Sequence, residues 1–182
     1  MTSEQELIAQ LKNKQTQENA FRILMGQYKE RLYWHIRKIV VSHADADDVL
    51  QNTFVKIYRN IDKFKGESKL YSWMYRIATN ESITFINKRA KQNNVDITEY
   101  QHNLANTLQD DVHFSGSEIQ LILQKAIATL PEKQQLVFKM KYFDEMKYND
   151  MSEILDTSVG ALKASYFHAV KKIELYIKKE TN

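Results

Sequence analysis

Residues 148–172, YNDMSEILDTSVGALKASYFHAVKK, predict two short helices that are joined by a tight turn, the second of them basic. Met151 and Ile154 recur at helical spacing in the first helix and are expected to face a core. Asp156 occupies the turn, where a positive φ is often needed and where Asp tolerates it. Ser158 then stands where it can cap the second helix. This is the layout of a helix-turn-helix, whose second helix enters the DNA major groove.

The second helix of this pair has one apolar stripe and an opposite, basic face. Gly160 lies in its first turn, where the absence of a side chain lets the backbone approach a phosphate. Lysines suit contact with phosphates, and an exposed Phe can meet a thymine methyl group. The residues of this segment that we expect to contact DNA are Ser158, Gly160, Lys163, Phe167, His168, Lys171 and Lys172. The alternative is a terminal helical hairpin whose lysines are only solvated. A metal-binding role for His168 is discounted, because no partner His stands at helical spacing.

The composition favours a small helical protein. The 182 residues include 4 Gly and 1 Pro, which argues for helices joined by short loops and against a sandwich or barrel. The absence of Cys excludes disulfides and thiolate zinc sites and fits a cytoplasmic protein. No apolar run approaches the length of a membrane span, and the N-terminus lacks the apolar core of a signal peptide, so we expect no membrane insertion. The net charge of +3 is too small to identify a nucleic-acid binder.

Helical periodicity also covers the first half of the chain. Apolar residues in 20–41 recur at steps of three, four and seven, which predicts one long amphipathic helix. A second helix is expected to begin near Asp45, where carboxylates favour the helix dipole. The loop 63–68 follows, with Gly at its bend and Ser68 as the expected N-cap of the next helix. That third helix is expected over residues 69–91.

The third predicted helix combines aromatic and cationic side chains. Its rings are Tyr71, Trp73, Tyr75 and Phe85, and its cations are Lys69, Arg76, Lys88 and Arg89. This mixture suits single-stranded DNA, because bases stack on rings for about 1–3 kcal/mol each while cations follow the backbone. Trp73 lies on the apolar stripe from Leu70 to Ile77 and is expected in the core. Tyr71 and Arg76 are the better candidates for DNA contact.

The segment 90–117 lacks this periodicity and carries a net charge of −3. We expect a flexible linker between two small helical domains, residues 1–89 and 118–182, in an all-α protein. An equally open alternative is that the segment folds back with a short helix around Tyr100–Leu108. In the second block the helical pattern restarts at Pro131, near the first position of a helix.

Two sets of motifs make the chain similar to a known family. The first set is DADDVLQNTF at 45–54, KFKG at 63–66 and SWMYRIATN at 72–80. The second set is LPEKQQLVF at 130–138, YNDMSEIL at 148–155 and VGALKAS at 159–165. In this order they resemble regions two and four of the extracytoplasmic-function (ECF) sigma factors, and the resemblance covers most of the chain. Two matched regions are more specific than a helix-turn-helix alone.

The resemblance implies a dissociable initiation subunit of bacterial RNA polymerase and not an enzyme. The partners that it implies are core RNA polymerase, promoter DNA and an anti-sigma factor, with no cofactor, metal or small-molecule substrate. In the family, region two binds a coiled coil on the largest core subunit and melts the minus-ten promoter element. Region four reads the minus-thirty-five element.

The resemblance also implies roles for particular residues. Those implied to bind core polymerase are Asp47, Asp48, Gln51 and Asn52. Those implied to contact the minus-ten element are Lys65, Gly66, Ser68, Tyr71, Arg76, Asn80, Lys88 and Arg89, the first three in a loop that pockets a flipped base. The predicted DNA contacts within 158–172 become minus-thirty-five contacts. The chain departs from the family at Lys147, where a Ser or Thr cap is usual. It also departs at Ser165 and His168, where many members carry arginines, so DNA contacts there should be weaker or the recognised sequence different.

Two other classes of function stay open from the residues alone. One is a DNA-binding regulator with a helical dimerisation domain, which would bind duplex DNA without polymerase. The other is a nuclease that holds Mg²⁺ on Asp45, Asp47 and Asp48, although three carboxylates at one helix start make a poor metal site. Asp47 and Asp48 are also explained by the helix dipole alone.

Overall fold

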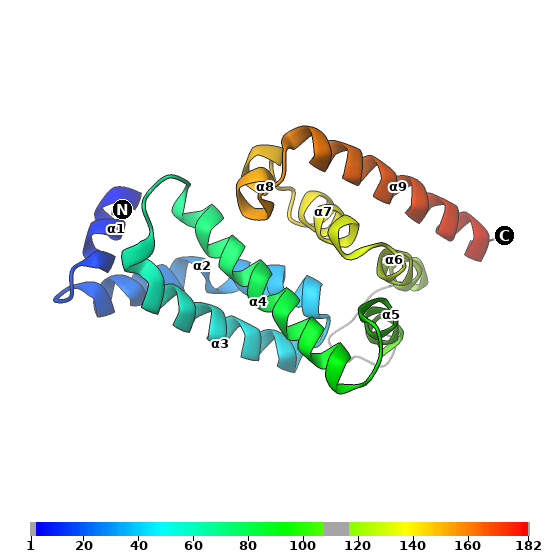
Figure 1. The fold of residues 1–182 in the computed structure, drawn as a ribbon, viewed down its shortest axis with the longest axis horizontal. Coiled ribbons are helices and arrows are strands. Elements are labelled where there is room, and N and C mark those ends of the chain that lie inside the picture. Colours follow the sequence, from blue (N-terminus) through cyan, green and yellow to red (C-terminus); the bar gives the residue numbers. More distant parts are fainter. Residues whose placement is uncertain (1–2, 108–116, 182) are drawn as a thin grey trace.

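The computed structural model describes residues 3–107 and 117–181, and every regular element within these ranges is a helix (Figure 1). The first half contains α1 (Glu4–Lys12), α2 (Gln17–Val40), α3 (His43–Asn60), the short 3-10 helix η1 (Ile61–Lys63) and α4 (Leu70–Gln92). The second half contains α5 (Ile97–Thr107), α6 (Glu118–Ala128), α7 (Glu132–Tyr142), α8 (Tyr148–Leu155) and α9 (Val159–Thr181). The predicted all-α fold is confirmed for this described part of the chain.

Helices α2, α3 and α4 pack side by side into a bundle, and α1 packs against one end of α2 (Figure 1). Apolar residues at helical spacing meet between them. Leu24, Leu32 and Ile36 of α2, Ile57 of α3 and Met74 of α4 are all fully buried. Burial of each such side chain is worth about 1.5–3 kcal/mol, so the amphipathic stripes stabilise one common core.

Helix α3 begins slightly before the predicted start. The Ser42 hydroxyl accepts a hydrogen bond from the Asp45 backbone N–H at 3.4 Å and caps the helix at His43. This places Asp45 in the first turn and moves Asp47 and Asp48 beyond it. Only Asp45 then lies where a carboxylate complements the positive end of the helix dipole.

Helix α4 begins at Leu70 with Lys69 as its N-cap, so the predicted cap at Ser68 is wrong. The Leu70 backbone N–H points to a carboxylate oxygen of Glu4 in α1, 3.5 Å away. A carboxylate from a helix that is distant in the sequence therefore stands where a local cap was expected, because the first N–H groups of a helix have no partner within it and can donate to any suitable acceptor.

Helix α4 buries more of its surface than one apolar stripe provides. Leu70 and Ile86 are buried as predicted, but Trp73 is only half-buried at the edge of the core, with its ring 5.3 Å from that of Phe64. The buried residues of α4 also include Ser72, Tyr75, Thr79 and Ser82. The reason is that α4 packs against α2, α3, α5 and α8, so several of its faces are covered.

A helix forms inside the segment that was predicted as a linker. The alternative of a short helix near Tyr100–Leu108 is confirmed, with α5 spanning Ile97–Thr107. The side chain of Asp96 accepts a hydrogen bond from the Glu99 backbone N–H at 2.9 Å at the start of this helix. Residues 108–116 of the predicted linker lie outside the described residues.

Helices α6, α7 and α9 form a second core, and α8 and α9 form the predicted helix-turn-helix. The buried residues of this core are Ala126, Ile127, Leu130, Phe138, Ala169 and Ile173. Asp156 adopts the left-handed conformation predicted for the turn, with φ 50° and ψ 48°. The Ser158 hydroxyl accepts a hydrogen bond from the Ala161 N–H at 3.3 Å, which confirms its capping role. Lys147 precedes α8 and provides no side-chain cap.

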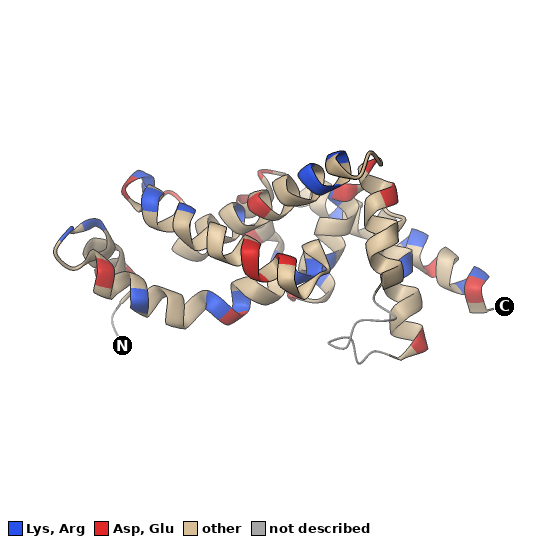
Figure 2. Cartoon of the chain, turned by 90° about the horizontal axis from the view of Figure 1, so that it is seen from below, with Lys and Arg blue, Asp and Glu red and all other residues tan. Residues whose placement is uncertain are grey.

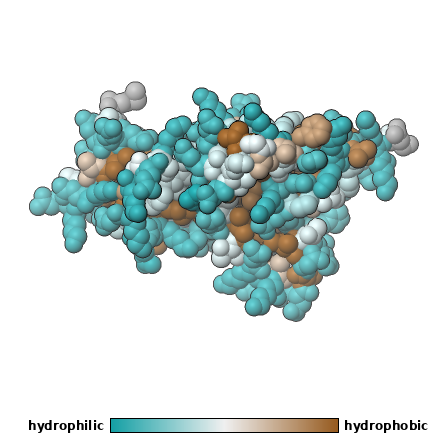
Figure 3. Space-filling model, turned by 45° about the horizontal axis from the view of Figure 1, so that its top comes forward, coloured by the Kyte–Doolittle hydropathy of each residue, from teal (hydrophilic) through white to brown (hydrophobic). Residues whose placement is uncertain are grey.

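The two halves pack against each other, with α8 on α4 and α7 beside α2 (Figure 1). The core of the first half continues into the second through Met140, Met146, Met151, Ile154 and Leu162. Basic and acidic side chains are interspersed along the helices (Figure 2), and Figure 3 shows a mainly hydrophilic face with scattered apolar patches.

Candidate functional site

The four residues predicted to bind core polymerase share one face of α3. Asp47, Asp48, Gln51 and Asn52 are all exposed. Residues three and four positions apart lie on the same side of a helix, so the two carboxylates and the two amides form one patch. A partner can reach all four from a single direction.

This patch borders an open groove of about 730 Å³ between α2 and α3. Asp47 and Gln51 line the groove together with Phe21, Met25, Lys29, Leu50, Phe54, Val55, Tyr58 and Arg59. Val55 and Tyr58 are 42% and 40% exposed, which is high for such large apolar side chains. A mainly apolar groove with polar groups at its edge suits an amphipathic helix from another protein.

The loop before α4 forms a hollow of about 330 Å³. Its lining residues are Lys63, Phe64, Lys65, Glu67, Ser68, Ser72, Trp73, Arg76 and Glu153. Three residues predicted to contact the minus-ten element, Lys65, Ser68 and Arg76, therefore meet at one place. Gly66 bends the loop with a φ of 78°, a value that L residues rarely adopt. Cations and an aromatic ring around a hollow are the combination that suits an extruded base.

Tyr71 is not free to stack on a base in this structure. Its ring packs on that of Tyr75 with centroids 4.2 Å apart, and the Arg31 guanidinium lies 5.1 Å from its centroid. Burial raises the pKa of both tyrosines above the ordinary value, so both are neutral phenols near pH 7. Tyr71 thus contributes to the contact between α2 and α4, and contact with DNA requires its ring to move.

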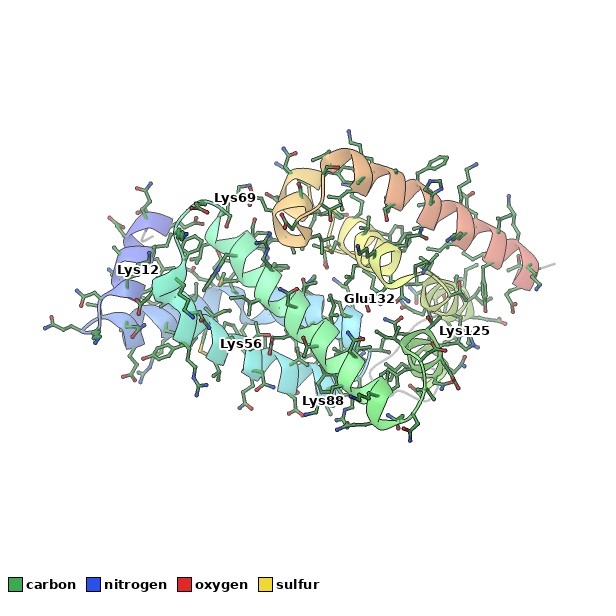
Figure 4. All side chains as sticks on the ribbon, in the orientation of Figure 1. Lys12, Lys56, Lys69, Lys88, Lys125 and Glu132 are labelled. Carbon is green, nitrogen blue, oxygen red and sulfur yellow. The ribbon has the colours of Figure 1, made fainter. Side chains whose placement is uncertain are left out.

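The cations at the start of α4 contact α8 and the turn that follows it. Arg76 Nε donates to the Ile154 carbonyl oxygen at 3.4 Å, and Arg76 Nη2 lies 3.8 Å from Asp156 Oδ1. Lys69 Nζ lies 2.7 Å from Asp150 Oδ1, and this hydrogen bond raises the pKa of Lys69. Figure 4 shows Lys69 at the end of α4 that lies beside α8.

The opposite end of α4 lies away from α8, as Lys88 shows in Figure 4. Asn80, Lys88 and Arg89 are exposed. Arg89 Nη2 is 3.3 Å from Asp45 Oδ1, and its guanidinium lies 5.0 Å from the Phe85 ring centroid. Of the predicted minus-ten residues, Arg76 therefore contacts the end of α8, while Asn80, Lys88 and Arg89 are exposed.

The DNA contacts predicted for the helix-turn-helix all lie on exposed positions. These are Ser158, Gly160, Lys163, Phe167, His168, Lys171 and Lys172. Phe167 is 57% exposed, with Lys171 Nζ 5.3 Å from its ring centroid. A Cβ added at Gly160 would meet nothing within 4 Å, so internal packing does not require glycine there. Close approach of an external group such as a phosphate would explain why this position is a glycine.

Asp45, Asp47 and Asp48 have separate surroundings. Asp45 pairs with Arg89, and Asp47 Oδ2 lies 3.6 Å from His43 Nε2, while Asp48 is exposed. Within the described residues, no three His, Cys, Asp or Glu side chains are grouped so that they could hold a metal ion. This geometry does not support the nuclease hypothesis. None of the described helices combines the length and the apolar character needed to cross a membrane.

A buried polar contact joins the two halves, and no sequence pattern indicated it. His35 is 2% exposed; its Nδ1 lies 3.1 Å from Asp144 Oδ2 and its Nε2 lies 2.8 Å from Thr79 Oγ1. Lys38 Nζ also contacts Asp144. Burial by itself would raise the pKa of Asp144, but the hydrogen bonds and charges of His35 and Lys38 hold it below its ordinary value. Asp144 stands more than 100 positions from His35 and from Lys38 in the chain, so no local sequence pattern could indicate these contacts.

Known proteins match the segments that carry these surfaces. The family model of sigma-70 region 2 matches residues 24–92, and that of sigma-70 region 4 matches residues 120–173. The chain is 30% identical over 168 residues to the ECF RNA polymerase sigma-E factor of Haemophilus influenzae, covering 88% of each chain. It is 30% identical over 158 residues to the ECF RNA polymerase sigma factor SigW of Bacillus subtilis, covering 82% of this chain and 84% of SigW.

Two solved structures share the fold. CnrH in complex with the cytosolic domain of CnrY gives a TM-score of 0.67 at 19% identity, covering 95% of this chain and 96% of that chain. The sigma factor RpoE of Bartonella quintana, in complex with the anti-sigma factor NepR, gives a TM-score of 0.65 at 20% identity, covering 87% and 96%. The α3 patch, the hollow beside α4 and the exposed face of α9 all fall within or directly beside the two matched regions. The chain therefore belongs to the ECF family of RNA polymerase sigma factors.

Proposed function

We propose that this sigma factor binds core RNA polymerase and directs promoter recognition and melting through three surfaces. The α3 patch and the α2–α3 groove bind a helical element of the core enzyme. The loop 65–68 and α4 hold the separated minus-ten strand, and the exposed face of α9 reads the minus-thirty-five duplex. Two domains, residues 1–89 and 118–182, supply these surfaces on either side of residues 90–117. The protein acts in the cytoplasm by binding and positioning, not by catalysis.

The observation that carries this proposal is the distribution of the three residue sets. The polymerase set lies on α3, the minus-ten set on the loop and α4, and the minus-thirty-five set on α9. Each set has the chemistry that its partner requires. An apolar groove suits a helix, a hollow with cations and a ring suits an unstacked base, and exposed lysines with a free backbone position suit duplex phosphates.

Run-off transcription with purified core polymerase tests the proposal. The double variant Asp47→Arg/Gln51→Ala should weaken core binding about tenfold or more, because the groove loses its acidic edge and gains a charge in the contact. The variant Asp62→Arg makes the same charge change on exposed η1, away from the groove, and should leave core binding unchanged. Absence of core binding and of any transcript with the wild-type protein would contradict the proposal. Tight binding to duplex DNA without polymerase would support the regulator instead.

We further propose that an anti-sigma factor restrains the protein. Both solved structures of similar fold are complexes with a second protein, and in the RpoE complex this second protein is the anti-sigma factor NepR. The exposed Val55 and Tyr58 in the groove offer an apolar surface that such a protein can cover. Purification from the native host should yield a partner that core polymerase displaces. A protein found only free or on polymerase would count against this partner.

A further inference from the structure

A buried hydroxyl group in the first turn of α4 has no hydrogen-bond partner within the part of the chain that the structure describes. Ser72 is 1% exposed, and among the described residues its Oγ is the only buried side-chain nitrogen or oxygen that lacks a partner. An unpaired buried hydroxyl group costs free energy of folding, and native structures contain few of them. Such an exception needs an explanation, and a ligand that arrives from outside supplies one.

The other buried hydroxyl groups of the same bundle show what Ser72 lacks. Thr53, Thr79 and Ser82 each donate to the carbonyl oxygen four residues earlier in their own helix, at 2.7, 2.7 and 2.8 Å. Ser72 is the third residue of α4, so the position four residues before it is Ser68, in the loop. Its hydroxyl group therefore has no helical carbonyl oxygen four positions behind it. The start of the helix at this point leaves the group available to another partner.

Ser72 lies at the hollow beside the loop that precedes α4. Ser72 and Arg76 stand four residues apart and so lie on one side of α4, and both line this hollow of about 330 Å³. Trp73 adds its half-buried ring to the lining, and the loop adds Lys65 and Ser68. The unpaired hydroxyl group thus belongs to a surface that also has a ring and cations, which are the groups that suit an extruded base.

The hydroxyl group is better suited to reading a base than the charged groups around it. Those groups have both signs, since Glu67 and Glu153 line the hollow together with the cations. Contacts of cations with phosphates hold a strand but carry no information about its bases. The side chain of Ser72 is short and stands on a helix, so the position of its hydroxyl group is well defined, and that group can donate to or accept from a base edge.

We propose that Ser72 is a specificity-determining residue of the minus-ten site, whose hydroxyl group hydrogen-bonds the edge of the base held in the hollow. This inference rests on the proposed function of loop 65–68 and α4. A base that offers a suitable partner satisfies a group that the folded protein leaves unpaired. Any other base leaves that group unpaired after water has been displaced, so one base is preferred at one position of the minus-ten element.

The test is run-off transcription by the reconstituted holoenzyme on a genomic promoter that the wild-type protein uses, with its minus-ten element randomised. Ser72→Ala removes the hydroxyl group and keeps a small side chain. Initiation with the preferred base should fall about five- to tenfold, while initiation with the other bases at that position should change little. The preference should therefore disappear at one position and persist at the others. Ser72→Thr keeps a hydroxyl group and should keep the preference.

Urea unfolding of the free full chain gives a second readout of opposite sign. Ser72→Ala should be at least as stable as wild type, because it deletes a buried hydroxyl group that has no partner. The matched control is Ser82→Ala, which deletes a buried hydroxyl group of the same helix that donates to the Ala78 carbonyl oxygen. This control should be no more stable than wild type and should keep the full base preference.

A base preference that persists in Ser72→Ala would overturn the inference. A position that needs only a small side chain would give this result, because alanine is small. Equal loss of preference in Ser82→Ala, or an equal fall of initiation with all four bases in Ser72→Ala, would also overturn it, because a general change in α4 would then explain the loss. If the wild-type holoenzyme does not initiate, the proposed function fails and the inference fails with it. If wild type initiates with a preference that Ser72→Ala retains, only the inference fails.

Discussion

Helices α4 and α9 carry the same kinds of side chain, but the fold treats them differently. Cations at the start of α4 are paired with carboxylates of α8, as Lys69 is with Asp150. The lysines of α9 contact rings or an amide instead: Lys171 lies over Phe167, and Lys172 Nζ donates to the Gln134 side chain at 3.1 Å. Among the described residues, the cations at the start of α4 are thus paired with carboxylates, and the lysines of α9 are left open.

The difference between open and paired cations affects two steps of promoter binding, the attraction of duplex DNA and the later contact with the separated strand. A surface whose lysines have no carboxylate partner can attract duplex phosphates at any time. A surface whose cations are already paired must first exchange one set of partners for another, so its apparent affinity includes the cost of opening. We therefore expect α9 to be competent for weak duplex binding in the free protein, and Lys69 and Arg76 to contact DNA only after they leave Asp150 and Asp156.

The largest effect should come from Arg76→Ala. In the holoenzyme this change removes a charged contact to the minus-ten strand that is worth about 1.5–3 kcal/mol, so initiation should fall about 10- to 100-fold. Duplex binding by α9 should be unaffected, which can be checked by a gel shift with the same protein. The control Arg22→Ala removes an exposed pair with Glu18 and should leave initiation unchanged. Normal initiation by Arg76→Ala would remove α4 from the proposed DNA surface.

The variant Lys139→Met should stabilise the folded protein, in which α7 packs at the contact between the two halves. Lys139 of α7 is 7% exposed, and its Nζ lies 3.4 Å from Gln135 Oε1. Burial lowers its pKa to about 8 from the ordinary 10.5, so near neutral pH the folded protein keeps a proton in an unfavourable place. Replacement by Met should raise the free energy of unfolding by about 1–3 kcal/mol at pH 7.

The pH dependence of this gain has a definite sign. Below about pH 8 both folded and unfolded chains hold the Lys139 proton, and the destabilisation of wild type is complete. Between about pH 8 and 10.5 the unfolded chain binds the extra proton, so wild type recovers and the advantage of Met shrinks. Urea unfolding at either end of this range measures it, with the exposed Lys133→Met as control. An advantage that does not change with pH would show that packing alone, and not the buried charge, causes it.

The smallest effect should come from Phe167→Ala on the open surface. The ring is exposed, so the free energy of unfolding should change by no more than about 0.5 kcal/mol. Loss of its apolar contact with a base should weaken duplex binding by about 1 kcal/mol, or roughly fivefold. Leu175→Ala, two turns further along α9 and 69% exposed, is the matched control. Equal weakening by both variants would mean that Phe167 does not meet the groove specifically.

Local sequence signals predicted the helix-turn-helix in detail. The left-handed turn at Asp156 and the cap at Ser158 depend on only a few neighbouring residues, so the sequence contains all that they require. The N-cap of α4 was predicted wrongly at Ser68, because the group nearest the first N–H of the helix comes from Glu4, 66 positions away. Trp73 was placed in the core on the strength of one apolar stripe, but α4 is covered on several sides and the stripe does not define its buried surface.

The sequence by itself determined most of the helices and their order, because periodicity, caps and turn residues act within a few positions. It also carried the motifs that identify the family, and the resemblance to that family implied roles for particular residues. Only the tertiary structure decided which of those residues pair with side chains of another helix and which stay exposed to solvent. The contacts of Asp144 with His35 and of Asp150 with Lys69 join residues 109 and 81 positions apart. Pairing over such distances depends on how whole helices pack, and so the difference between the paired cations at the start of α4 and the open face of α9 exists only in the folded chain.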